Sequence, residues 1–168
     1  MRILQRIMIL IGLTAIFAQV GLNASQQDGA WATGVKEAAK LVLSNSSKPE
    51  DIDRSLTRLL DIAITIAARD SRSPAEFQKR LQAASKAFSE NPLGAKSWEA
   101  LNAAYKSING EKDFKFPDGV KTPGDASRVA KEHIDRTVKA LESGQSSQAV
   151  RDILSFILLV TTPMMQQP

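Results

Sequence analysis

Polar side chains recur every three or four positions from residue 54 to residue 69, and the positions between them are nearly all apolar. The polar stripe consists of Arg54, Arg58, Asp61, Thr65 and Arg69. Residues at this spacing lie on one side of an α-helix, so the pattern predicts a helix over about residues 49–70. A helix with so narrow a polar stripe must be covered by other segments on most of its sides.

Five other segments repeat the helical spacing, and the sequence contains no convincing pair of strands. Helices are expected over residues 30–44, 74–90, 95–108, 123–143 and 146–161. Six helices with mostly short links predict an all-α fold, a single-domain bundle formed by residues 25–168. The segments 49–70 and 146–161 are the most apolar, and we expect these two helices to meet at the centre.

Short local motifs predict several helix ends. Ser73 with Glu76, and Thr122 with Asp125, have the spacing of capping boxes, in which two side chains satisfy free backbone donors. Pro163 is expected to end the last helix, because proline lacks a backbone donor. Residues 25–29 are expected to form a mobile polar leader ahead of the first helix.

The first 24 residues have the layout of a secretory signal peptide. Arg2 and Arg6 precede an apolar run over residues 7–18, and the small residue Ala24 stands at the expected cleavage position. The run is shorter than the roughly 20 residues that a membrane span needs, although an uncleaved anchor is the alternative. We therefore expect residues 1–24 to direct export and residues 25–168 to lie in the periplasm or outside the cell, without stable transmembrane insertion.

The charge balance argues against a nucleic-acid partner. The chain has 22 Lys and Arg residues against 18 Asp and Glu residues, a formal net charge of +4. Loss of residues 1–24 removes two arginines and no acidic residue, which leaves 20 − 18 = +2. A nucleic-acid-binding protein usually has a clustered basic footprint, and we see none along residues 25–168.

The sequence contains no cysteine and a single histidine, His133. Disulfides and thiol catalysis are therefore excluded. A zinc site usually needs three or four ligands, and Glu132 and Asp135 point away from each other on a helix. The sequence contains no glycine-rich phosphate loop and no serine-nucleophile motif. We expect His133 to be an ordinary boundary residue, and we expect no metal and no cofactor.

Two groups of residues are candidates for binding. Arg54, Arg58 and Arg69 share one stripe and are suited to a small anionic ligand, because guanidinium grips carboxylate and phosphate in a forked geometry. The alternative is a solvated stripe balanced by neighbouring acids. Phe114 and Phe116 lie on a long charged link and are candidate anchors for a partner protein, unless both pin the link to the bundle.

These features lead to two hypotheses about function. The first is a secreted or periplasmic helical bundle that acts as a binding module at the cell envelope, with another protein as its partner. The alternative is a small exported all-α enzyme that acts on an anionic metabolite through its arginines. No motif in the sequence fixes a reaction, so we expect binding rather than catalysis.

Overall fold

The computed structural model describes residues 24–44, 46–71 and 73–165, and these residues form a single all-α bundle. Of the expected signal peptide, residues 1–23 lie outside the described residues. The prediction of about six helices is confirmed. The helices are α2 (Ala24–Val42), α3 (Pro49–Arg69), α4 (Ala75–Glu90), α5 (Ala95–Ile108), α6 (Pro123–Glu142) and α7 (Ser146–Met165).

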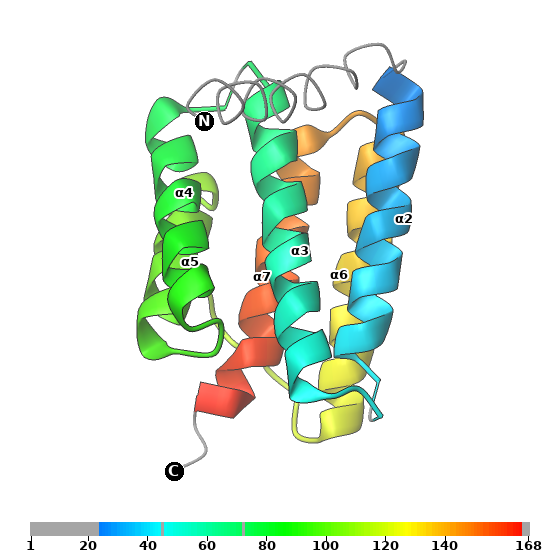
Figure 1. The fold of residues 1–168 in the computed structure, drawn as a ribbon, viewed down its shortest axis with the longest axis vertical. Coiled ribbons are helices and arrows are strands. Elements are labelled where there is room, and N and C mark those ends of the chain that lie inside the picture. The colour runs from blue at the N-terminus through cyan, green and yellow to red at the C-terminus, as the bar shows by residue number, and fades with distance from the viewer. Residues whose placement is uncertain (1–23, 45, 72, 166–168) are drawn as a thin grey trace, which may run out of the picture.

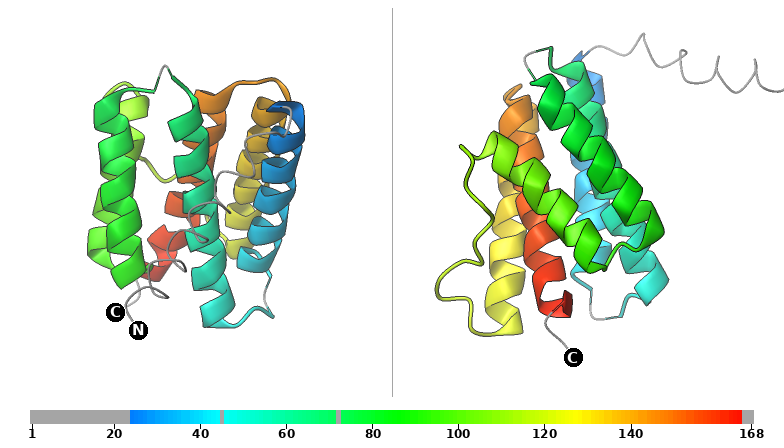
Figure 2. Two further views of the ribbon diagram at one scale, coloured as in Figure 1. Left: turned by 45° about the horizontal axis from the view of Figure 1, so that its top comes forward. Right: turned by 90° about the vertical axis from the view of Figure 1, so that its left-hand side faces the viewer.

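The six helices form two groups of four that share their central pair. Helices α2, α3, α7 and α6 contact one another in that cyclic order, and α3, α4, α5 and α7 do the same. Figures 1 and 2 show that neighbouring helices run antiparallel and that α3 and α7 stand between the α2–α6 side and the α4–α5 side. The expected meeting of the two most apolar helices is confirmed.

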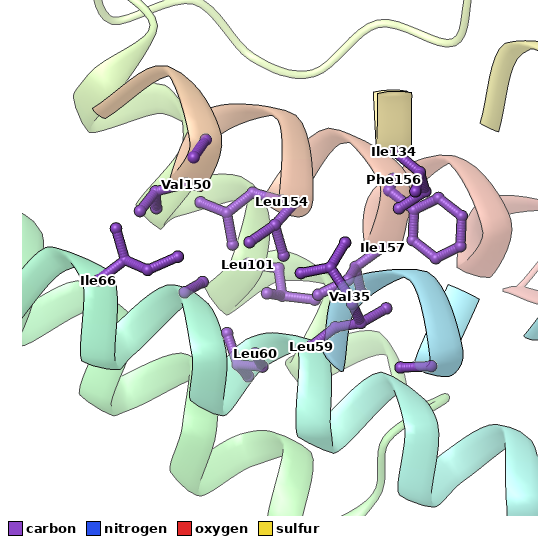
Figure 3. Packing of buried hydrophobic residues seen from close by; sticks show 14 of the residues in the cluster. Val35, Leu59, Leu60, Ile66, Leu101, Ile134, Val150, Leu154, Phe156 and Ile157 are labelled. Atoms are coloured by element: carbon purple, nitrogen blue, oxygen red, sulfur yellow. The ribbon is translucent and has the colours of Figure 1, made fainter. Parts of the chain in front are cut away.

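The centre of the molecule is the contact between α3 and α7. Residues 152–159 of α7 are all buried, so this helix is covered on every side for about two turns. On α3 the polar stripe faces solvent, as its spacing predicts, and the leucines face inward. Figure 3 shows side chains of the two helices pointing toward each other, among them Leu60, Ile66, Val150, Leu154 and Ile157.

One long connection crosses the bundle. Helices α5 and α6 run in the same direction, so residues 109–122 must return along the length of the molecule (Figure 2). Asn102 holds this segment, because its side chain accepts a hydrogen bond from the Phe114 backbone N–H at 2.8 Å and donates one to Asp113 at 3.1 Å. The rings of Tyr105 and Phe114 meet edge to face with centroids 5.7 Å apart.

Helix α2 begins earlier than its sequence suggests. The predicted polar leader over residues 25–29 is wrong, because these residues form the first turns of α2. Asp28 lies in this stretch and forms an ion pair with Arg69 of α3. The polar sequence alone does not predict a helix over residues 25–29. The ion pair with α3 accounts for the helix there.

The two expected capping boxes have different outcomes. Thr122 and Asp125 form the predicted box at the start of α6. The prediction for Ser73 and Glu76 is wrong, because Pro74 occupies the cap position of α4 without a side-chain hydrogen bond. Glu76 instead accepts a hydrogen bond from Arg80, one turn farther along, at 3.1 Å. The Glu76 carboxylate therefore takes part in a side-chain hydrogen bond along the exposed side of α4 and does not cap the start of the helix.

Helix α7 continues past its expected end. It runs to Met165, beyond Pro163, which was expected to stop it. The missing backbone donor of Pro163 therefore does not end the helix at this position. Across the described residues, every helix falls short of the length and apolar character that a membrane crossing needs.

Replacement of Leu60 or Ile157 by alanine is expected to lower the free energy of unfolding by about 2–5 kcal/mol, because each truncation leaves a cavity in a packed core. Both side chains are at most 1% exposed. Leu41→Ala, at a leucine that is 46% exposed, is the control and should change stability by about 0.5 kcal/mol or less. Urea unfolding followed by circular dichroism measures all three, and equal midpoints would contradict the assignment of the core.

Candidate functional site

The arginines of the α3 stripe do not converge on one site. Arg54 forms an ion pair with Asp51 of the same helix at 3.2 Å, and Arg58 forms one with Glu37 of α2 at 3.3 Å. These four side chains are between 39% and 78% exposed, so each pair is well solvated. Solvated pairs of this kind contribute little to stability. A shared role in binding one small anion stays a prediction.

Arg69 joins the first turns of α2 to the last turn of α3. Its Nη2 lies 2.5 Å from Asp28 Oδ1, and its guanidinium lies 4.4 Å from the centre of the Trp31 ring. The Arg69 and Asp28 side chains are 32% and 16% exposed, which makes this the most protected of the three arginine pairs on α3. A cation held over an aromatic ring and against a carboxylate acts as a clamp between the two helices.

Phe114 and Phe116 lie against the bundle. Both side chains are half-buried and pack against the hydrophobic core. Phe114 is held further by its backbone bond to Asn102 and its ring contact with Tyr105. This geometry favours the interpretation in which the two aromatic rings pin the long link, and it leaves their role as partner anchors untested.

A hollow in the surface lies elsewhere, between α2 and α6. It is an open groove of about 410 Å³ formed by the C-terminal half of α2, the two residues that follow this helix and the middle of α6. Most of its lining is apolar, and its apolar residues are Leu43, which is partly exposed, and Ala39 and Ile134, which are buried. The two helices are antiparallel neighbours at one edge of the bundle (Figure 1). The groove is therefore open to solvent along its outer side.

Lysine side chains surround this apolar surface. Lys36 and Lys40 line the groove one helical turn apart on α2, and Lys131 lines it from α6. Within the described part of the chain, none of the three forms an ion pair. Asp135 is the single acidic residue of the lining. We call these three lysines with their apolar floor the lysine groove.

The opposite side of α6 carries a polar cluster that contacts α7. Asp152 of α7 is buried, with a side chain only 5% exposed. Its Oδ1 lies 3.2 Å from His133 Nδ1 and accepts a hydrogen bond from Arg136 Nε at 3.1 Å, while Oδ2 accepts one from Gln148 at 2.5 Å. A buried carboxylate is stable only when donors replace the lost water. The cluster therefore ties α6 to α7.

The pKa of Asp152 reflects two opposing effects. Burial alone would raise it, but hydrogen bonds with His133, Gln148 and Arg136, together with the positive charge of Arg136, bring the pKa below its ordinary value. The sequence prediction missed this cluster. The available signal was an aspartate in the middle of an otherwise apolar helix, which implies a partner on a neighbouring helix.

The described residues contain no group of three or more histidine and acidic side chains arranged to hold a metal ion.

Comparisons with protein-family models, with curated proteins and with solved structures give no match for this chain.

Asp152→Asn is expected to lower the free energy of unfolding by about 1–3 kcal/mol near neutral pH, because a buried charged hydrogen-bond acceptor is lost. Since the folded-state pKa is lowered, the contribution of Asp152 is complete above its ordinary pKa of 3.8 and is lost as the pH falls below that value. Urea unfolding at a series of pH values should show the gap between wild type and variant shrinking below about pH 4. A gap that persists unchanged in stronger acid would contradict this account.

Arg69→Ala is expected to destabilise the fold by about 1–2 kcal/mol, because it removes both the ion pair with Asp28 and the contact with Trp31. Arg54→Ala is the matched control on the same helix, with a side chain 78% exposed, and should be near neutral. Thermal unfolding of the two variants beside wild type measures the difference. Equal melting temperatures for the two variants would show that the clamp adds nothing.

Proposed function

We propose that this chain is exported and acts as a binding module for another protein, which it contacts through the lysine groove. The observation that carries the proposal is the groove itself, where three lysines that have no ion-pair partner among the described residues border an apolar surface. Protein interfaces commonly combine an apolar centre with a polar rim. The groove has this composition within one continuous surface.

The location of the partner follows from the expected export. The basic start, the short apolar run and Ala24 favour secretion of residues 25–168. A secreted or periplasmic chain meets proteins of the cell envelope or the medium. This part of the proposal rests on the N-terminal sequence alone.

The alternative, an exported enzyme that uses arginines on an anionic metabolite, has less support. Such a site needs cationic side chains that converge on one substrate. Arg54, Arg58 and Arg69 are spread along α3 and pair with three separate carboxylates, one on α3 and two on α2. None of these arginines lines the lysine groove. The groove is open and mostly apolar, which suits contact with a partner surface better than enclosure of a small metabolite.

The proposal predicts a specific crosslink in intact cells that express the full chain. The photo-reactive amino acid p-benzoylphenylalanine is placed at Asp135, which lines the groove. Irradiation should give one discrete larger adduct, recovered from the periplasmic or extracellular fraction, whose second component is a protein. Denaturing gels and mass spectrometry of the adduct provide the measurement.

The control carries the same amino acid at Gln82, an exposed position of α4 on the other side of the molecule. It should not give that adduct. Adducts of equal yield from both positions would indicate random collision, and the absence of an adduct from Asp135 would contradict the proposed function.

A further inference from the structure

We propose that the lysine groove receives an acidic amphipathic α-helix from the partner protein, with the apolar side of that helix on the groove floor and its Asp and Glu residues beside the lysines. This inference rests on the proposed function and adds the chemistry of the partner. Three features of the groove support it: the charges at the rim, the length of the lining and the helical backbone beneath most of the floor.

The charge of the groove lining determines the charge that we expect on the partner surface. Lys36, Lys40 and Lys131 outnumber the single acid, Asp135, in the lining. A docked surface that is neutral or basic would leave these cations unpaired, whereas carboxylates at the edges of the contact would pair with them. The same argument disfavours a second copy of this chain, because a two-fold contact between identical grooves would bring lysines against lysines.

The dimensions of the groove suit a short stretch of helix. Its lining extends from Lys36 on α2 to Ser44, just past the end of that helix, and at the helical rise of 1.5 Å per residue this stretch is roughly 12 Å long. A partner helix covers that length with roughly eight residues, or two turns. Two turns present apolar side chains at positions i, i+3 or i+4, and i+7 on one side, which is the pattern of helix-in-groove recognition.

Backbone hydrogen bonding favours a helix over an extended peptide as the occupant of the groove. The groove floor consists of the Ala39 and Ile134 side chains inside two helices and of Leu43, one residue past the end of α2. The Leu43 backbone N–H already bonds to the Ala39 carbonyl at 2.9 Å. An extended peptide on this floor would have no partners for its inward-facing N–H and C=O groups, and unpaired buried backbone groups are costly. A helix satisfies these groups internally.

Fluorescence anisotropy with labelled model peptides tests the inference on the full chain. Three peptides of roughly 18 residues, long enough to be helical, share one leucine stripe. The first has glutamates beside the stripe, the second has lysines instead, and the third has the acidic sequence with two central prolines that prevent a helix. The acidic helix should bind at least about tenfold more tightly than either of the others, and less tightly as salt increases.

Matched charge-reversal variants locate the binding. The triple variant Lys36→Glu, Lys40→Glu and Lys131→Glu should weaken binding of the acidic helix by about tenfold or more. The control reverses Lys79, Lys86 and Lys96, three exposed lysines on α4 and α5, and should stay within about twofold of wild type. Circular dichroism confirms that both variants remain folded.

Three results of these peptide-binding experiments would overturn the inference. They are no saturable binding of the acidic helix, equal binding of the helical and proline-containing acidic peptides, and equal losses in the two triple variants. Binding to phosphatidylglycerol vesicles with no binding of the peptides would assign the lysines to an anionic membrane surface instead. If the crosslink from Asp135 maps to a partner segment that is neither helical nor acidic, the proposed function stands and this inference fails. If no protein adduct forms, the proposed function fails first.

Discussion

The structure depends on the burial of α7 against α3. Eight consecutive residues of α7, 152–159, are buried, and six of them are apolar. Apolar burial is the main favourable contribution to folding. One neighbour cannot cover a helix on all sides, so α7 requires α3, α5 and α6 around it. Helix α3 is likewise covered by α2 and α4. The two groups of four helices form because both helices of the central pair must be covered by neighbouring helices.

The same burial accounts for the polar cluster at the interface between α6 and α7. An aspartate in the middle of a surrounded helix loses its water, and an unpaired charge there would oppose folding strongly. Asp152 remains charged because His133, Arg136 and Gln148 surround it. These contacts fix one side of α6 against α7, and α2 covers the opposite side of α6 only in part. The lysine groove lies in the space that this arrangement leaves open.

Local rules predicted some features of this fold well and others badly. The range 95–108 and the Thr122 cap were correct, because both depend on residues within one or two helical turns. The helical state of residues 25–29 depends on a contact with α3, and local composition does not encode such a contact. Arg69 is a second residue whose contacts the local sequence does not encode. Its position predicts a solvated stripe, whereas packing places its side chain between Asp28 and the ring of Trp31.

The sequence by itself determined the all-α class, the approximate helix boundaries and the identity of the two most buried helices. Each of these depends on the spacing of polar and apolar residues along a continuous stretch, and that spacing is visible in the chain. Tertiary structure alone decided that Lys131 joins Lys36 and Lys40 around one apolar floor, and that Asp152 meets His133. The helical spacing of apolar residues predicts which side of a helix is buried. The neighbour that covers that side, and the register of the contact, depend on how side chains from distant segments fill space together.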